Sequence, residues 1–326
     1  MLHFDKMQYF PRMRKNLSIW LLGAMLLSAC GGSSGDSETP CGSGGPLTGP
    51  GGDFNGPYMQ RSFTGPDGID RKWLIRLPRD YQPGERTDVI FNFHGSGSNA
   101  EAQLVYGDLT EQADQGRAIL VVPDANKVFP DRANELANYW DSAWEANLRV
   151  RDYDLDFVLN LVDTVKSEYC TADFFATGMS AGGDMVSALQ CLQDSPFSAY
   201  APVTYMYYNQ AECAGAPPRP LIYFHGDADF IVPIEGSGPP WNDPPVVDAM
   251  QAWADHNQCE AGPVEQRISD EVLRYFWDGC AAATEWYLVE GGGHTWPGAI
   301  SVGLGYTTED IAASDLIWEF FTTHRP

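Results

Sequence analysis

The segment "DFFATGMSAGGDM", Asp173 to Met185, contains a serine between glycines directly after a run of β-forming residues. It includes the pattern G-x-S-x-G, from Gly178 through Ser180 to Gly182. In a tight turn between a strand and a helix, this spacing exposes the serine hydroxyl to a cleft. Because the chain contains 33 glycines, the pattern also arises by chance, so its meaning depends on the neighbouring elements.

The residues around this turn are typical of a strand followed by a helix. "DFFATG" favours a strand, and Gly182–Gln193 favours a helix. Upstream, Asp156–Tyr169 is predicted to form an amphipathic helix. Its apolar face consists of Phe157, Leu161, Val162 and Val165. Ser180 therefore lies at the strand-to-helix turn that its motif requires.

Further along the chain, short apolar runs typical of strands alternate with segments typical of helices. The predicted strands are Lys72–Pro78, Asp88–Gly95, Ala118–Asp124, Asp173–Gly178, Tyr200–Met206, Arg219–Gly226 and Thr284–Gly291. Two later helices are predicted at Val246–Gln258 and Thr308–His324, the second with Thr308 or a neighbour as its N-cap. This alternation predicts an α/β protein with one domain, in which helices cover a mostly parallel central sheet.

The N-terminus has the pattern of a targeting signal. Basic residues precede the apolar run Leu17–Ala29, which is too short to span a bilayer comfortably, so residues 1–29 are predicted to be a cleaved signal peptide. The sequence "LLSAC" resembles a bacterial lipobox, which would place a lipid on Cys30. A plain secretory signal cut nearby is the alternative. Either reading predicts export.

The next segment, residues 30–57, is dominated by Gly, Ser and Pro and has no apolar period. Such a composition cannot bury enough surface to fold, so we expect a flexible tether before a catalytic domain at 58–326. With the lipid on Cys30, the protein would be anchored to a bacterial membrane. Gly31 after Cys30 points to the outer membrane where the host has one.

Cysteine usage agrees with export. Besides Cys30 the chain has six cysteines, and an even number in an exported protein favours disulfides. The preferred pairs are Cys191 with Cys213 and Cys259 with Cys280, which leaves Cys41 and Cys170.

Charge and spacing exclude several classes of ligand. The formal net charge is −24, and no basic cluster with interleaved aromatic residues is present, so nucleic acid is not an expected partner. The aspartates of "RDYDLDF" alternate like those of an EF-hand loop, but Phe157 occupies the position that requires glycine. We expect no metal and no cofactor.

A serine hydroxyl needs a base to remove its proton, and the base needs a carboxylate to orient it. His294 lies in the glycine-rich segment "GGGHTWPG" after the last predicted strand and is the best candidate base. Asp227 and Asp229 both follow the strand Arg219–Gly226, where an acid is expected in the chain order serine, acid, histidine.

The oxyanion of an acyl-transfer reaction requires two backbone N–H donors. One is expected from Ala181, directly after Ser180, and the other from Ser96 in the loop "FHGSGSN" after an early strand. We expect His94 in that loop to be structural rather than catalytic.

Four ordered motifs resemble a known family. "RLPRDYQPGERTDVIFNFHG", "YCTADFFATGMSAGGDM", "HGDADFIVP" and "GGGHTWPG" are similar to the secreted esterases that group poly(3-hydroxybutyrate) depolymerases with feruloyl and acetyl xylan esterases of carbohydrate esterase family one. The match runs from about Arg71 to Gly298. The resemblance implies an α/β-hydrolase fold and assigns the acid of H-G-T-x-D-x-x-V-P to Asp229. The family's threonine is replaced by Asp227.

The resemblance also draws attention to three tryptophans as substrate contacts. Trp296 follows the histidine as in the family's H-x-W-P-G and is expected to form a wall of the cleft. Trp140, in "NYWDSAW", and Trp241, in a proline-rich segment, are further candidates. These residues, and the aromatic segment Thr204–Asn209, could contact an acyl group or a sugar, or could pack in the core.

The sequence therefore predicts an exported, lipid-anchored serine esterase that uses Ser180, His294 and Asp229. Its substrate would be a polyhydroxybutyrate-type polyester or a feruloyl or acetyl ester of plant polysaccharide, and its partners that substrate and the membrane. The alternative is a catalytically inactive surface lipoprotein on a hydrolase scaffold that binds polysaccharide or a partner. A lipase would be expected to have a longer apolar lid segment.

Overall fold

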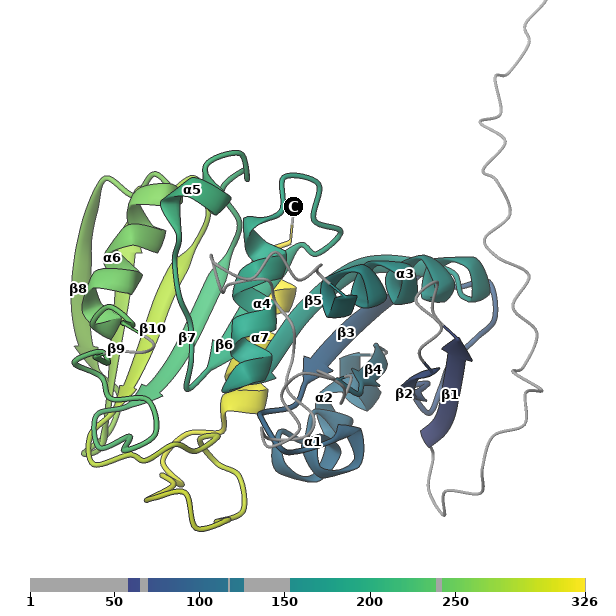
Figure 1. Cartoon of the computed structure of the whole chain (residues 1–326), viewed down its shortest axis with the longest axis horizontal. Helices are drawn as coiled ribbons and strands as arrows, with labels where there is room; N and C mark the ends of the chain where they lie inside the picture. The colour runs from purple at the N-terminus through teal and green to yellow at the C-terminus, as the bar shows by residue number, and fades with distance from the viewer. Residues whose placement is uncertain (1–57, 65–69, 117, 126–152, 239–241, 326) are drawn as a thin grey trace, which may run out of the picture. The chain divides into compact units, whose positions relative to one another are not determined.

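A sheet of ten strands forms the centre of the computed structural model, which describes residues 58–64, 70–116, 118–125, 153–238 and 242–325. The strands lie in the order β1-β2-β4-β3-β5-β6-β7-β10-β9-β8 (Figure 1). Their bounds are β1 Tyr58–Thr64, β2 Asp70–Arg76, β3 Thr87–Phe93, β4 Ile119–Pro123, β5 Thr171–Met179, β6 Ala199–Val203, β7 Leu221–Gly226, β8 Ala261–Arg267, β9 Val272–Asp278 and β10 Thr284–Val289.

The middle of the sheet is parallel and its two margins are antiparallel. Strands β4, β3, β5, β6, β7 and β10 pair in parallel, whereas β1 and β2 on one side and β9 and β8 on the other run antiparallel to their neighbours. Because parallel strands end at the same edge, the loops after β3, β5, β7 and β10 meet there. These four loops contain Ser96, Ser180, Asp229 and His294.

Helices cover both faces of the sheet. Their bounds are α1 Ala100–Tyr106, α2 Thr110–Gly116, α3 Tyr153–Glu168, α4 Ala181–Cys191, α5 Gln210–Cys213, α6 Val246–His256 and α7 Ala313–Thr323. Helices α3, α4 and α6 contribute to one buried apolar cluster, and α1, α2 and α7 to a second one. Figure 1 shows α4 in front of the sheet and α7 behind it. The predicted single-domain α/β-hydrolase architecture is confirmed.

Alternating side chains of the central strands supply these two clusters. On β7, Tyr223 belongs to the first cluster and Phe224 to the second. On β5, Phe174 likewise belongs to the first cluster and Phe175 to the second. Because helices cover both faces of the sheet, the sequences of these strands are continuous apolar runs. Such runs made the central strands predictable from the sequence. The predicted apolar face of α3 is buried: Phe157, Leu161, Val162 and Val165 are each at most 3% exposed.

Of the four strands at the margins of the sheet, only β2 was predicted, as Lys72–Pro78. The hairpin of β8 and β9 escaped notice because every residue of β8 is exposed and Pro263 lies within it, so it has no apolar period. Short helices α1 and α2 were also missed. The last helix begins at Ala313 rather than after Thr308, because the Thr308 hydroxyl accepts from Asp310 N–H in a local turn and donates to Glu271.

Two predicted disulfides are confirmed. Cys191 is bonded to Cys213 and Cys259 to Cys280. Cys170 is disulfide-bonded as well, while Cys41, the remaining candidate partner, lies outside the described residues, as does Cys30.

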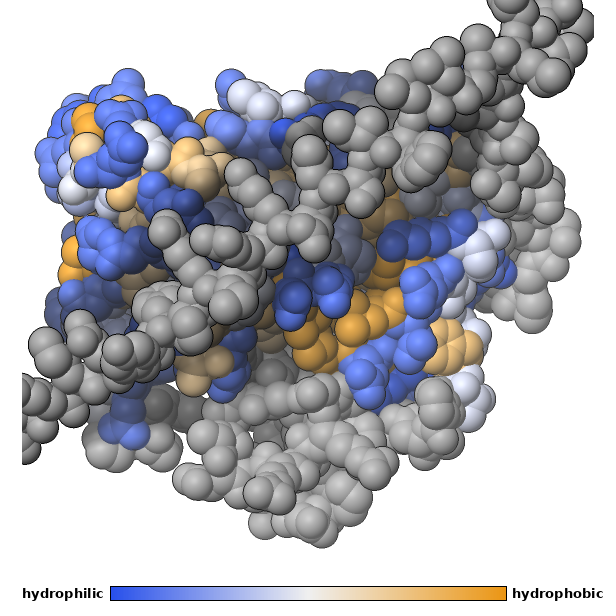
Figure 2. All heavy atoms as spheres, turned by 90° about the horizontal axis from the view of Figure 1, so that it is seen from above, coloured by the Kyte–Doolittle hydropathy of each residue, from blue (hydrophilic) through white to orange (hydrophobic). Residues whose placement is uncertain are grey.

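Hydrophilic residues occupy much of the described surface that is visible from above, with apolar residues gathered between them (Figure 2). No helix in the described ranges is long and apolar enough to cross a membrane. Within the same ranges, no three His, Cys, Asp or Glu side chains form a group that could hold a metal ion. Asp154, one of the aspartates of the EF-hand-like spacing, instead forms a buried ion pair with Arg71.

Candidate active site

Ser180 lies in a strained turn between β5 and α4. Its backbone angles, φ 56° and ψ −121°, are unusual for a residue with a side chain. Two bonds hold the turn: the Ser180 N–H donates to Val203 O at 2.8 Å and to Thr204 Oγ1 at 3.1 Å. Ser180 is half-buried and immediately precedes the first turn of α4. This is the geometry predicted from G-x-S-x-G.

The glycines of the motif are required by close packing rather than by their backbone angles. A Cβ on Gly182 would lie 2.2 Å from Phe93 O, and one on Gly178 would lie 2.7 Å from the carbonyl carbon of Gly182. A Cβ on Gly183 would lie 2.2 Å from Tyr205 O. The start of α4 therefore packs directly on the backbone of β3 and of the loop after β6.

Thr204, directly after β6, contacts this turn, and sequence reasoning had named it only as part of the segment Thr204–Asn209. It is fully buried and has φ 63°, a rare value for a β-branched residue. Its hydroxyl accepts the Ser180 N–H, and its own N–H donates to Phe224 O at 2.9 Å. A hydrogen bond therefore joins two strained residues, one directly after β5 and one directly after β6. Nothing in the local sequence indicates this backbone conformation.

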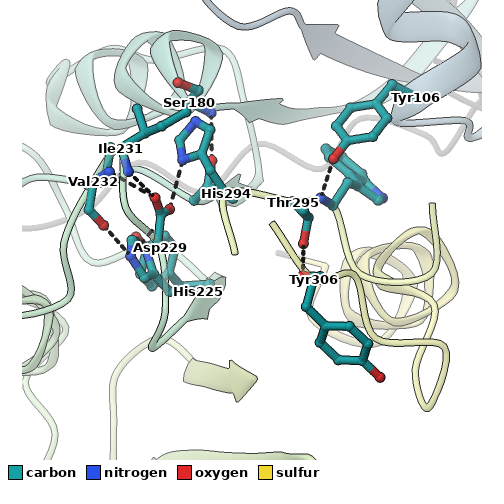
Figure 3. Close-up of polar contacts among 12 residues, drawn as sticks. Tyr106, Ser180, His225, Asp229, Ile231, Val232, His294, Thr295 and Tyr306 are labelled. Atoms are coloured by element: carbon teal, nitrogen blue, oxygen red, sulfur yellow. Dashed lines mark hydrogen bonds and ion pairs between the residues drawn. The ribbon is translucent and has the colours of Figure 1, made fainter. Parts of the chain in front are cut away.

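His294 and Asp229 are joined although 65 residues separate them. His294 Nδ1 lies 2.7 Å from Asp229 Oδ2, and the carboxylate and the imidazole are both nearly inaccessible to solvent. The other carboxylate oxygen, Oδ1, accepts from Ile231 N–H at 2.9 Å and from Val232 N–H at 2.8 Å. In the view of Figure 3 the His294 ring lies between Asp229 and Ser180. Asp229 can therefore orient the imidazole through Nδ1.

The two aspartates after β7 have different surroundings. Asp227 is exposed, and its Oδ1 accepts from Gly291 N–H at 2.6 Å. Asp229 is 4% exposed and bonds to His294. The two loops that carry them are held together by backbone contacts, since Ala228 N–H donates to Gly292 O. Asp227 therefore stabilises the contact between the loops after β7 and β10, and Asp229 binds the histidine.

The loop after β3 lies against Ser180. A Cβ on Gly95 would lie 3.3 Å from Ser180 Cβ, which places the neighbouring Ser96 close to the turn. Ala181 is the first residue of α4, where backbone N–H groups lack partners within the helix. Both expected donors are thus near Ser180.

His94 ties this loop to its neighbours. Its Nε2 accepts from Ala125 N–H at 3.0 Å, so Nδ1 carries the proton and donates to Gly95 O at 2.7 Å. Burial lowers the pKa of His94 to about 4, which keeps the ring neutral at physiological pH. The bonds agree with the structural role expected for it.

Trp296 does not form a wall of an open cleft, and that expectation is wrong. The side chain is 1% exposed within the second apolar cluster, and its indole N–H donates to Ser314 Oγ at 3.1 Å. Its backbone N–H donates to the Tyr106 hydroxyl at 3.2 Å. The large apolar ring is more stable packed between α1 and α7 than beside solvent.

The remaining predicted substrate contacts divide into two groups. Trp140 and Trp241 lie outside the described residues. In the segment Thr204–Asn209, Tyr207 is buried, whereas Tyr208 is half-buried and packs against Trp253, with ring centroids 5.0 Å apart. A groove of about 720 Å³ between β1 and α3 includes none of the candidate catalytic residues.

The chain is similar to known esterases. Residues 68–259 match the model of the Esterase family, described as "Putative esterase". The chain is 25% identical to Feruloyl esterase C of Emericella nidulans over 281 residues, which cover 82% of this chain and 91% of that protein. It is 26% identical to Feruloyl esterase D of Neurospora crassa, with 81% and 85% covered.

Solved structures support the fold. The acetyl xylan esterase from Aspergillus awamori superposes with a TM-score of 0.55 at 14% identity, covering 74% of this chain and 94% of that one. Esterase 2 of Thermogutta terrifontis, phosphorylated by paraoxon, gives a TM-score of 0.50 at 16% identity, with 82% and 94% covered. At these identities the likeness concerns the fold.

Proposed function

This chain belongs to the Esterase family, and we propose that it hydrolyses carboxylic esters through an acyl-enzyme on Ser180, with His294 as general base and Asp229 as its orienting acid. The observation that carries the proposal is the bond of 2.7 Å between His294 Nδ1 and the buried Asp229 carboxylate, beside a serine in a strained strand-to-helix turn. Nδ1 is engaged, so Nε2 is the ring nitrogen that remains for the serine.

The reaction proceeds in two halves. Ser180 Oγ attacks the ester carbonyl while His294 Nε2 takes its proton, and the C–O bond to the alcohol breaks as His294 returns that proton to the leaving oxygen. Water then attacks the acyl-enzyme, again with His294 as base, and releases the acid and free Ser180. The N–H groups of Ala181 and Ser96 stabilise the negative oxygen in both halves.

Asp229 is held in place for this role. Two backbone N–H groups donate to Oδ1 and fix the orientation of the carboxylate. Its other oxygen is then free to stabilise the imidazolium that forms when His294 takes a proton. Buried and desolvated, this interaction is stronger than it would be in water.

For the substrate, we propose an ester of a hydroxycinnamic acid such as ferulic acid. Feruloyl esterase C of Emericella nidulans and feruloyl esterase D of Neurospora crassa, which match over more than four fifths of this chain, support it. Phe230 and Ile231 directly follow Asp229 and are 66% and 48% exposed, an apolar margin suited to an aromatic acyl group. Polyester of the 3-hydroxybutyrate type and acetyl esters of polysaccharide are the alternatives to be tested.

We further propose that the protein is exported and anchored through a lipid on Cys30. The disulfides Cys191–Cys213 and Cys259–Cys280 support an oxidising compartment. Incorporation of labelled palmitate by expressing bacterial cells, compared with Cys30→Ala, tests the anchor. Equal labelling of both proteins would contradict it.

Substrate and mechanism are tested together with methyl ferulate, 3-hydroxybutyrate oligomers and 4-nitrophenyl acetate. The purified protein and Ser180→Ala are compared on each. We expect methyl ferulate to give the highest kcat/KM, and Ser180→Ala to lose activity by about 10⁴-fold or more. Preference for the oligomers would assign polyester breakdown. If no ester is cut above the Ser180→Ala background, the catalytic proposal fails and a binding scaffold becomes the better account.

A further inference from the structure

A second buried histidine, His225, lies next to the proposed acid and has no part in the mechanism above. It belongs to β7, is 1% exposed and precedes Asp229 by four residues. His225 Nε2 lies 3.7 Å from Asp229 Oδ2, which is too long for a hydrogen bond. A connection by hydrogen bonds from His225 to Asp229 therefore passes through another group.

The hydrogen bonds of His225 determine where its proton lies. Nε2 is 2.9 Å from Val232 O, and a carbonyl oxygen can only accept, so Nε2 carries the hydrogen. Nδ1 is 2.5 Å from the Tyr223 hydroxyl, which donates to it. Burial lowers the pKa of His225, so the neutral ring with this tautomer is favoured.

Val232 connects this histidine to the acid. Its carbonyl accepts from His225, and its N–H donates to Asp229 Oδ1 at 2.8 Å. The hydrogen bonds therefore run from Tyr223 to His225, from His225 to Val232, and from Val232 to Asp229. Figure 3 shows His225 on the far side of Asp229 from Ser180, with its bond to Val232.

We infer that His225 is a positioning residue for the esterase reaction: by holding the Val232 carbonyl it fixes the turn that keeps two N–H donors on Asp229 and directs Oδ2 at His294. The inference rests on the function proposed above. Tyr223 supports it by fixing the tautomer of His225. Without the Nε2–H donor, the turn from Asp229 to Val232 relaxes and the carboxylate no longer holds the imidazole in line with Ser180.

The expected effect is on kcat rather than on KM. A displacement of about 1 Å in catalytic geometry costs up to about 10²-fold in rate. Because Phe230 and Ile231 lie in the same turn, the two constants are measured with 4-nitrophenyl acetate, whose small acyl group depends little on that apolar margin. His225→Leu should therefore lower kcat by about tenfold or more with little change in KM. His225→Gln places an amide N–H at a similar reach from the backbone, and should recover about half or more of that loss on a logarithmic scale.

A spectroscopic readout separates positioning from general loss of structure. In the proton NMR spectrum, the strongly hydrogen-bonded His294 Nδ1 proton should give a far downfield resonance that is absent from His294→Gln. We expect His225→Leu to shift this resonance upfield or abolish it, and His225→Gln to restore it in part. An unchanged resonance in folded His225→Leu would overturn the inference.

Tyr223→Phe and Tyr200→Phe form a matched pair in case His225→Leu does not fold. Both tyrosines are fully buried in the first apolar cluster, but the Tyr200 hydroxyl donates to Ser195 Oγ at 2.7 Å, away from the site. Tyr223→Phe should lower kcat about threefold or more, whereas Tyr200→Phe should lower only the melting temperature. Equal kcat values for the two folded variants would overturn the inference.

Failure of the proposed function gives a different result from failure of this inference. If the unmodified protein cuts no ester faster than Ser180→Ala, the catalytic proposal fails, and the NMR comparison of the His225 variants still decides whether His225 positions Asp229. If the protein is active but kcat and the resonance are the same in folded His225→Leu, only the role of His225 is lost.

Discussion

At Ser180, the proposed nucleophile, backbone packs on backbone, whereas at Asp229 and His294, the proposed acid and base, side chains are connected by hydrogen bonds. Gly182 leaves no room for a Cβ against Phe93, and Ser180 and Thr204 both adopt positive φ. On the other side, Asp229 is held by two N–H donors and bonds to His294. The first arrangement tolerates no added atom. The second can be weakened one bond at a time, so the two sides should respond differently to substitution.

The largest effect is expected on the acid and base side. Asp229→Asn would present an amide N–H to His294 Nδ1 and favour the wrong tautomer, which should lower kcat for 4-nitrophenyl acetate by about 10⁴-fold without unfolding the protein. Asp227→Asn is the matched control, because an amide oxygen can still accept from Gly291 N–H, and should remain within about twofold of the unmodified protein. Equal losses in both variants would contradict the assignment of the acid.

The nucleophile side should respond through stability. In Gly182→Ala, the new Cβ would have to displace the backbone of Phe93, at a cost of about 3 kcal/mol or more. Gly215→Ala is the control, since its Cβ would lie 3.7 Å from Gln193 Oε1 and should change the free energy of unfolding by less than about 0.5 kcal/mol. Urea unfolding measures both. A Gly182→Ala protein as stable as the control would show that the start of α4 can move.

The smallest effect concerns the pH dependence of the free energy of unfolding and tests the role of His94 in the loop after β3. Burial lowers the pKa of His94 from 6.5 to about 4, so between these values the unfolded chain binds a proton that the folded protein does not. The contribution of His94 to the free energy of unfolding is therefore constant above about pH 6.5. It is lost as pH falls towards 4, by up to about 1.4 kcal/mol per pH unit.

His94→Gln should reduce this slope by about one proton's contribution in urea unfolding measured from pH 8 to pH 4. The variant's overall loss of stability is read at pH 8, where His94 is neutral in both states. Buried His225 also has a lowered pKa, so part of the slope should remain. An unchanged slope in His94→Gln would mean that this histidine accepts a proton in the folded protein.

The difference between the two sides of the site also explains which of its features could be predicted from the sequence. The strand, the turn and the helix around Ser180 are adjacent in sequence, so local composition was sufficient to indicate them. The choice between Asp227 and Asp229 needed the family resemblance, since both follow β7. Thr204 and His225 carry no local signal of their roles, because each acts through a contact with a different loop or strand.

Burial was the least predictable property. Trp296 stands two residues from His294 in sequence, yet it packs between α1 and α7 instead of lining a cleft. Strand β8 is exposed throughout and exists because β9 pairs with it. In both cases the deciding partner lies elsewhere in the chain, and an apolar or a polar residue type is compatible with several environments.

The sequence by itself determined the α/β class, the strand-turn-helix at Ser180, the order of the candidate residues along the chain and the two disulfide pairs, because these depend on local patterns and spacing. Only the tertiary structure decided that Asp229 bonds to His294, that Asp227 fastens a loop junction, that Trp296 is core and that His225 reaches Asp229 through Val232. These features depend on distances of about 3 Å between segments far apart in sequence, which are set only when the parallel strands align at one edge of the sheet.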